Sequence, residues 1–228
     1  MGRTVDFDLF ARSTFLYPVA GYITGICAAV FCLLIAQPLL AAAAAIAVLF
    51  LISGCNHLDG LLDFGDGLMA HGSPEKRLSA MTDRYTGSGA IALGMATIIA
   101  TFASISSISS NTWLWVLIAE VMAALSLSYM TVVGKPSRQG IHSYLHESAK
   151  KRFLIYSTVL TLPLAWAAVT YAGIPVVILA MVYMVALFAQ LIIIGLSLRI
   201  FGGVSGDVVG ATHEIVRCVV LFAAALLL

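Results

Sequence analysis

The stretch IPVVILAMVYMVALFAQLIIIGLSL, residues 174–198, carries no charged side chain and decides the class of fold. A helix that crosses a bilayer requires about 20 mostly apolar residues, and this run reaches that length. Comparable apolar runs cover residues 15–36, 39–55, 88–108, 113–133 and 153–171. A last run, residues 215–228, is shorter and is expected to cross thinly or to lie half-inserted. The sequence therefore predicts an all-α polytopic integral membrane protein with about six to seven transmembrane helices.

The composition of the whole chain agrees with this prediction. Of the 228 residues, 61% are hydrophobic and 10% are charged, whereas a soluble domain usually carries about 25% charged residues. The net charge of +1 creates no global field that would attract a nucleic acid. We expect a single transmembrane catalytic domain over residues 1–228.

Charged residues gather in three polar segments, residues 56–87, 134–152 and 199–214, and at the N-terminus. The 12 basic residues lie in or beside these segments or before the first span: Arg3, Arg12, Lys76, Arg77, Arg84, Lys135, Arg138, Lys150, Lys151, Arg152, Arg199 and Arg217. The connections near Gln37, Asn111 and Gly173 carry no charge. The positive-inside rule places the N-terminus and all three polar segments on the cytoplasmic side of the cell membrane.

Carboxylates show the same asymmetry. All 11 except Glu120, which falls inside a predicted span, lie on the predicted cytoplasmic side. A transporter usually buries polar groups near the midplane of the bilayer. Polar residues at one interface therefore favour an enzyme that acts on a cytosolic substrate.

The densest polar motif is HLDGLLDFGDGL, residues 57–68. Its carboxylates Asp59, Asp63 and Asp66 have the spacing i, i+4, i+7, so they project from one face if the segment is helical. Three carboxylates this close repel one another, and a divalent cation removes the conflict. Carboxylate oxygens suit Mg²⁺, which usually shares its coordination sphere with substrate phosphates. We predict a Mg²⁺ site formed by Asp59, Asp63 and Asp66, with Asp83 as a further ligand.

Two other segments complete the polar set. In MTDRYTGSGA, residues 81–90, the guanidinium of Arg84 is suited to phosphate oxygens. In GGVSGDVVGATHE, residues 202–214, glycines and Asp207 suggest a backbone-lined pocket for an anion or a metal. His57, beside the aspartates, is a candidate base, whereas His71, His142 and His146 are expected at the surface.

Together these three segments resemble the signature blocks of the cobalamin synthase family, the adenosylcobinamide-GDP ribazoletransferases. HLDGLLDFGDGL is similar to the family's HLDGLADTADGL-type block, and the other two blocks follow in family order between the apolar spans. Leu62 and Phe64 replace residues that are usually small, and Arg84 stands one position before the usual arginine. Ser205 replaces a threonine and keeps the hydroxyl, whereas Arg217 falls where many members have a glutamate.

The resemblance implies that a ribose 5′ oxygen of α-ribazole, or of its 5′-phosphate, attacks the cobinamide-side phosphorus of adenosylcobinamide-GDP. GMP then leaves, and adenosylcobalamin or its phosphate is formed. The catalytic residues implied are Asp59, Asp63, Asp66, His57, Arg84 and Asp207. The residues expected to contact substrate are Gly60, Gly67, Asp83, Gly87, Gly202, Gly203, Ser205, Gly206 and Glu214.

The expected partners are the two substrates and the lipid bilayer, with no nucleic acid. A second copy of the chain and other corrinoid-pathway enzymes are further candidates. One alternative is a CDP-alcohol phosphotransferase, although the spacing D-x-x-x-D-x-x-D differs from that family's pattern. Another is a cation or solute transporter, for which Glu120 is the one candidate residue at the midplane.

Overall fold

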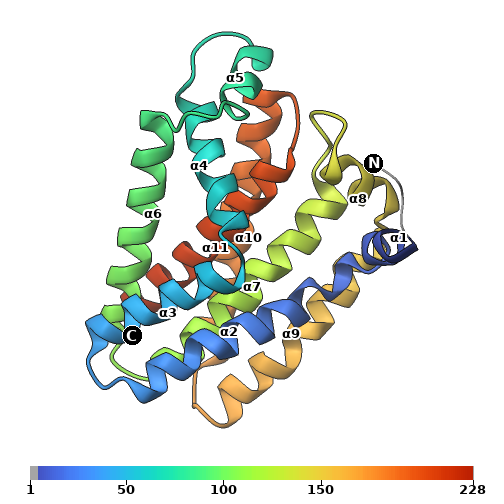
Figure 1. Ribbon diagram of the computed structural model, residues 1–228. Coiled ribbons are helices and arrows are strands. Elements are labelled where there is room, and N and C mark those ends of the chain that lie inside the picture. Colours follow the sequence, from blue (N-terminus) through green and yellow to red (C-terminus); the bar gives the residue numbers. More distant parts are fainter. Residues whose placement is uncertain (1–4, 228) are drawn as a thin grey trace.

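The computed structural model describes residues 5–227, and over these residues it consists of helices joined by short loops (Figure 1). The α-helices are α1 (Val5–Ala11), α2 (Tyr17–Leu34), α3 (Pro38–Ile52), α4 (Asn56–Met69), α5 (Pro74–Ala80), α6 (Ser88–Ser107), α7 (Thr112–Val133), α8 (Ile141–Ser148), α9 (Arg152–Thr170), α10 (Val176–Phe201) and α11 (Gly206–Leu227). A short 3-10 helix, Thr14–Leu16, precedes α2. Arg3 and Leu228 lie outside the described residues.

The predicted all-α membrane fold is confirmed. Six helical segments are long and apolar enough to cross a bilayer: Thr14–Leu34, α6, α7, α9, α10 and α11. The pair α3 and α4 passes the same test together but is bent by 93°. The described residues therefore contain six candidate spans, or seven if the bent pair is one broken span.

The last helix differs from the prediction. The sequence predicts a polar connection that extends to Glu214, but α11 already begins at Gly206 and is 22 residues long. The Oγ of Ser205 accepts a hydrogen bond from the amide of Val208 at 3.3 Å, which stabilises the start of the helix. Residues 207–214, which the prediction assigned to the connection, form the first turns of α11, so the helix is long and apolar enough to cross the bilayer.

The bend between α3 and α4 brings the aspartate motif into the bundle. Gly54 and Cys55 both have a φ of +58°, in the left-handed region, and they turn the chain between the two helices. As a result α3 ends at Ile52, before the predicted limit of residue 55. The predicted helix over the aspartates is confirmed, because α4 covers them all.

Helix α7 forms the centre of the bundle. In its most apolar stretch of 18 residues, 78% of the residues are buried. The corresponding share for α9, at the periphery, is 22%. It packs against α2, α9, α10 and α11. The approach of α2 is very close, because methyl groups on Gly21 and Gly25 would lie 2.7 Å from Ala124 Cβ and 2.9 Å from Leu117 Cδ1. This Gly-x-x-x-Gly pair allows the two backbones to meet.

A second hydrophobic cluster lies behind the aspartate helix. Leu61 and Phe64 are almost fully buried and pack with Phe201 of α10, with Val204 of the α10–α11 loop and with apolar side chains of α11. The rings of Phe64 and Phe201 are 5.9 Å apart. The bulky residue that replaces a small one in the family's first block thus anchors α4 from its apolar side.

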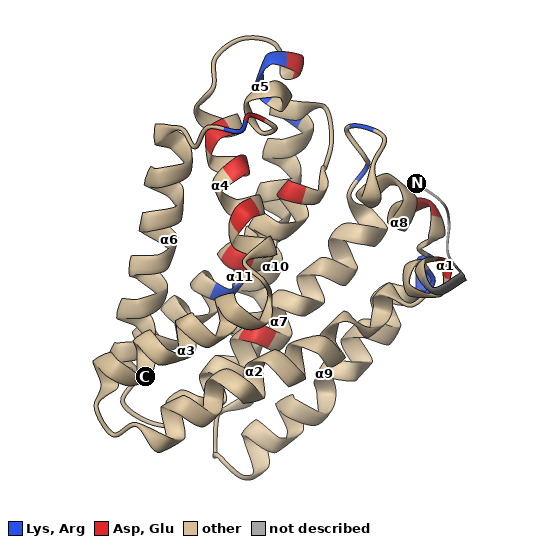
Figure 2. Cartoon of the chain, viewed as in Figure 1, with Lys and Arg blue, Asp and Glu red and all other residues tan. Residues whose placement is uncertain are grey.

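Most charged positions lie on one side of the bundle, as Figure 2 shows for α4, α5 and the α7–α8 connection. The turns α2–α3, α6–α7 and α9–α10 carry none. Arg217 departs from its predicted place at the edge of a polar segment, because it is 4% exposed inside α11. Its guanidinium is neutralised there by buried carboxylates, which explains how it can lie within a span.

Two histidines also differ from prediction. His142, expected at the surface, is 5% exposed, and its Nε2 lies 2.8 Å from the carbonyl oxygen of Gly134. Burial lowers the pKa of His142. His146 Nδ1 lies 2.9 Å from the carbonyl oxygen of Thr131, so both rings fix α8 beneath the end of α7. His71 is exposed as predicted.

Candidate active site

The polar face of α4 carries the aspartates. Asp59 is exposed and Asp63 is half-buried, and neither makes a hydrogen bond or ion pair with any described residue. Asp63 lies within electrostatic range of Asp59, Asp66 and Asp207 and of the guanidinium of Arg138. Leu61 on the opposite face is fully buried. The amphipathic helix thus presents two unpaired carboxylates on its polar face.

Asp66 has a structural task as well. Its two carboxylate oxygens accept hydrogen bonds from the amides of Gly87 and Ala90, at 2.7 and 2.8 Å. Gly87 immediately precedes α6 and Ala90 lies in its first turn, where backbone donors lack helical partners. Asp66 therefore caps α6 and joins the first sequence block to the second. Each oxygen retains a further lone pair.

The charged residues of the second block lie at the surface. Asp83 and Arg84 are exposed, and Asp83 Oδ1 accepts a hydrogen bond from the amide of Tyr85 at 3.1 Å. Arg77 instead binds the C-terminal end of α4, because its Nη1 donates to the carbonyl oxygen of Leu68 at 2.9 Å. The structure thus brings Asp66 to the second block but does not show Asp83 or Arg84 bonded to the other aspartates.

The third block faces α4 through the start of α11. A methyl group on Gly60 would lie 2.8 Å from the backbone oxygen of Asp207, so the two helices are in backbone contact. Asp207 Oδ2 accepts hydrogen bonds from Ser205 Oγ and Arg138 Nη2, both at 3.1 Å. The side chain of Asp207 therefore joins the polar face that contains Asp63.

Arg138 is a basic residue of this site that the sequence prediction did not single out. The loop that carries it is fixed by an isolated parallel bridge between Pro136 and Val204. Within this bridge the amide of Val204 donates a hydrogen bond to the backbone carbonyl oxygen of Lys135 at 2.7 Å. Arg138 and Asp207 are far apart in the sequence, and no local motif links them, so only the tertiary structure identifies the pair.

Most of the glycines that were predicted to contact substrate are instead packed closely against neighbouring residues. Methyl groups on Gly67 and Gly87 would lie 2.4 Å from Met81 Cγ and from Asp66 Oδ1, and one on Gly203 would lie 2.7 Å from Lys135 O. By contrast, Gly202 and Gly206 have free space where a Cβ would be. Gly202, with a φ of +73°, ends α10 in the left-handed conformation.

Glu214 lies deeper than the other predicted residues. It is 2% exposed, and one of its oxygens is bonded by Arg217. Arg217 also reaches Glu120 at 3.3 Å, and His213 lies between the two glutamates. Glu120 is thus the partner of a buried arginine from α11, and the one midplane feature that favoured a transporter is accounted for by this ion pair.

His57 lies at the junction of the aspartates and this buried cluster. Its ring lies against that of His213, with the centroids 4.1 Å apart, and its Nδ1 is buried with no hydrogen-bond partner. His57, His213 and Glu214 are the group of three possible ligands, among the residues that the structure describes, whose ligand atoms all lie within 4.8 Å of one another.

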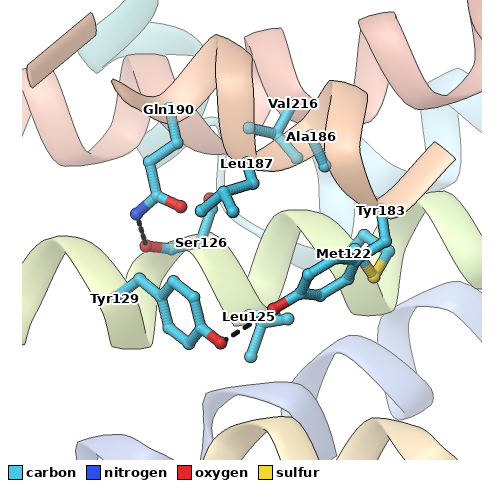
Figure 3. Close-up of a pocket in the computed structure, with 9 residues that line it drawn as sticks. All are labelled: Met122, Leu125, Ser126, Tyr129, Tyr183, Ala186, Leu187, Gln190 and Val216. Atoms are coloured by element: carbon cyan, nitrogen blue, oxygen red, sulfur yellow. Dashed lines mark hydrogen bonds between the residues drawn. The ribbon is translucent and has the colours of Figure 1, made fainter. Parts of the chain in front are cut away.

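Two cavities lie elsewhere and are apolar. The one in Figure 3, between α7 and α10, has a volume of about 10 Å³, which is the space of one water molecule. Beside it the hydroxyls of Tyr129 and Tyr183 are 2.9 Å apart, and Gln190 donates to the carbonyl oxygen of Ser126 at 3.2 Å. The other, of about 650 Å³, lies between α7, α9 and α10. Neither cavity is lined by an acidic side chain, so the aspartate face is the candidate active site.

Comparison with known proteins agrees with the motifs. The cobalamin-5-phosphate synthase family matches residues 2–225. The adenosylcobinamide-GDP ribazoletransferase of Methanocella arvoryzae is 35% identical, with 95% of this chain and 86% of the relative covered. The enzyme of the same name from Pyrococcus abyssi is 31% identical, with 93% and 87% covered. No solved structure matches significantly. The chain therefore belongs to the cobalamin-5-phosphate synthase family.

Proposed function

We propose that this membrane protein is an adenosylcobinamide-GDP ribazoletransferase, which performs a late step of vitamin B12 biosynthesis. The ribose 5′ oxygen of α-ribazole, or of its 5′-phosphate, forms a bond to the cobinamide-side phosphorus. The bond from that phosphorus to the bridging oxygen of the pyrophosphate breaks, and GMP leaves. The observation that supports this assignment is the meeting of α4 and α11, which brings two of the family's blocks to one polar face.

The donor set of this face fits a Mg²⁺ ion. Asp59 and Asp63 offer unpaired carboxylates, and hard oxygen ligands are those that Mg²⁺ prefers. Asp66 retains lone pairs beside its capping bonds, and we keep Asp83, on an exposed loop, as a further ligand. Asp207 completes the set or serves a second ion. When bound there, Mg²⁺ neutralises pyrophosphate oxygens and lowers the cost of releasing GMP.

The remaining residues position the substrate and move the proton. Arg138, held by Asp207 at 3.1 Å and 40% exposed, can turn toward a phosphate oxygen, and Arg84 can approach from its exposed loop. An aspartate that does not bind metal accepts the proton of the attacking hydroxyl. We prefer it to His57, because the Nδ1 of His57 is buried against His213. The open positions at Gly202 and Gly206 leave room for the nucleotide.

We also propose that this active face lies on the cytoplasmic side. The support is the positive-inside rule, since the loops beside the aspartates hold the basic residues and the opposite turns hold none.

The experiment that tests the function measures GMP release from adenosylcobinamide-GDP by detergent-purified protein. We expect release to require both α-ribazole and Mg²⁺ and to yield a cobalamin product. Folding is checked by circular dichroism and by a single peak in size-exclusion chromatography. If the folded protein released no GMP in the presence of both, the proposed activity would be wrong.

A further inference from the structure

The buried cluster below the aspartates has an incomplete set of interactions. His213 is 2% exposed, and its Nδ1 has no hydrogen-bond partner and lies 3.6 Å from Glu214 Oε1. The Nδ1 of His57 is also buried without a partner. Buried polar atoms are nearly always satisfied, so two orphan nitrogens on rings whose centroids are 4.1 Å apart require an explanation.

We propose that His57, His213 and Glu214 form a second metal site, for a divalent transition metal of the Zn²⁺ class. One ligand atom from each of the three residues lies within 4.8 Å of the others. Two imidazoles and one carboxylate suit Zn²⁺ or Co²⁺, whereas Mg²⁺ prefers an all-oxygen set. Such a site therefore differs in chemistry from the aspartate face.

The surroundings of the three residues resemble the outer shell of a metal site. A metal-binding histidine usually directs its second ring nitrogen at a carboxylate. His213 Nε2 lies 3.5 Å from Glu120 Oε1, and Thr24 Oγ1 donates to the same oxygen at 3.0 Å. The guanidinium of Arg217 bonds Glu120 Oε2 and Glu214 Oε2. This arrangement leaves Glu214 Oε1 facing His213 without a hydrogen-bond donor.

The cluster also holds a negative charge that attracts a cation. With neutral imidazoles, Glu120 and Glu214 supply two negative charges and Arg217 supplies one positive charge. The remaining negative charge is buried in a bundle, where it is costly unless it is compensated. A proton on His213 is the competing source of positive charge. That proton leaves both nitrogens of His213 3.5 Å or more from their carboxylates and leaves His57 Nδ1 unsatisfied. A metal ion bound by the Nδ1 atoms of both rings would satisfy both.

The site connects the two helices that carry the active face. His57 belongs to α4, and His213 and Glu214 belong to α11. The helices touch here, because a methyl group on Gly210 would lie 3.3 Å from His57 Cα. An ion between them fixes the separation of Asp63 from Asp207, one or two turns away.

Direct binding of Co²⁺ tests this inference without an activity assay. The full-length protein is purified in detergent with a tag that contains no histidine, stripped with a chelator and titrated with Co²⁺ in the presence of excess Mg²⁺. We expect about one equivalent to bind, with the visible absorption of a low-symmetry nitrogen and oxygen site. Zn²⁺ should displace the Co²⁺ and bleach the band, whereas excess Mg²⁺ should leave it.

Matched variants locate the ion. His57→Gln and His213→Gln should each lose the band, whereas His71→Gln, which removes an exposed histidine, should keep it. Asp63→Asn should also keep it, which separates this site from the Mg²⁺ ligands. His57 is only half-buried, so its variant is expected to fold even if that of His213 does not. Absence of binding to folded protein, displacement by Mg²⁺, or an unchanged band in His57→Gln would overturn the proposal.

Discussion

At the scale of single residues, Asp63 and Asp66 show how neighbours in one motif acquire different tasks. Asp66 uses both oxygens to cap α6, whereas Asp63 makes no hydrogen bond and faces Asp207 and Arg138. Helical geometry alone places them on the same side of α4. Their difference arises from the positions of α6 and α11, which are distant in sequence.

Replacing Asp63 with asparagine should therefore remove activity and spare the fold. The amide keeps the shape of the side chain but removes the negative charge that binds the cation, so we expect GMP release to fall by about 100-fold or more. The thermal unfolding temperature should stay within a few degrees of that of the unchanged protein. Glu75→Gln, at an exposed position on α5, is the control and should keep full activity. Full activity in Asp63→Asn would remove this residue from the metal site.

Replacing Asp66 with alanine should lower stability, which Asp63→Asn should not, in addition to any loss of activity. Two amides at the start of α6 lose their acceptor, and loss of a helix cap costs about 1–2 kcal/mol of the free energy of unfolding. Chemical or thermal unfolding in detergent, followed by circular dichroism, measures this change. Asp66→Asn keeps one acceptor oxygen and should lie between the alanine variant and the original protein. Equal stability of all three proteins would show that the capping bonds contribute nothing.

At the scale of helices, the contact between α4 and α11 depends on the absence of side chains. Gly60 and Gly210 allow the two backbones to meet, and an isolated bridge holds the loop of Arg138 against the start of α11. The apolar side of α4 is fixed by Leu61 and Phe64. Close packing on one side and backbone contact on the other together fix the aspartates relative to Asp207.

Replacing Gly60 with alanine should separate these helices. The added methyl group would lie 2.8 Å from the backbone oxygen of Asp207. The backbone cannot relieve such a clash by a change of rotamer, as a flexible side chain can. We expect a loss of stability of about 1–3 kcal/mol, as for overpacked cores, together with reduced GMP release. Gly195→Ala is the matched control within a helix, since no atom lies within 4 Å of its added methyl. It should unfold at the same temperature or higher, because alanine favours a helix. Identical behaviour of the two variants would contradict the packing argument.

At the scale of the whole molecule, most charged residues gather on the face that carries the candidate active site. The face with the aspartates also holds the basic loops, and the far turns are uncharged (Figure 2). The buried ion pairs of Glu120, Glu214 and Arg217 join α7 to α11, while Thr24 adds α2. Among the described residues, the buried Asp, Glu, Lys and Arg side chains are therefore confined to this one cluster.

The proposed orientation predicts which loops a membrane-impermeant maleimide reaches. In a variant with the four native cysteines changed to serine, Ser110→Cys in the α6–α7 turn should be labelled in intact cells. Ser79→Cys in α5 should be labelled only after the membrane is opened. Both positions are exposed, so access to each side, rather than burial, decides the result. The reverse pattern would place the active face outside the cell.

The sequence by itself determined the class of fold and the family. Long apolar runs require helices in a bilayer, because only a helix satisfies its own backbone there. The spacing of Asp59, Asp63 and Asp66 determined that they share one face of a helix, and α4 confirms that they lie on a single helix. These are local properties, fixed by the period of the helix and by hydrophobicity.

Only the tertiary structure decided how distant residues meet. Three contacts join separate segments of the chain: the cap that Asp66 provides to α6, the pair of Arg138 with Asp207, and the contact of His57 with His213. Arg217 illustrates the physical reason. Hydropathy treats any arginine as a marker of an interface, but a buried guanidinium is stable inside a span when carboxylates from other turns and other helices neutralise it. Such compensation depends on distance in space, which no local pattern of residues encodes.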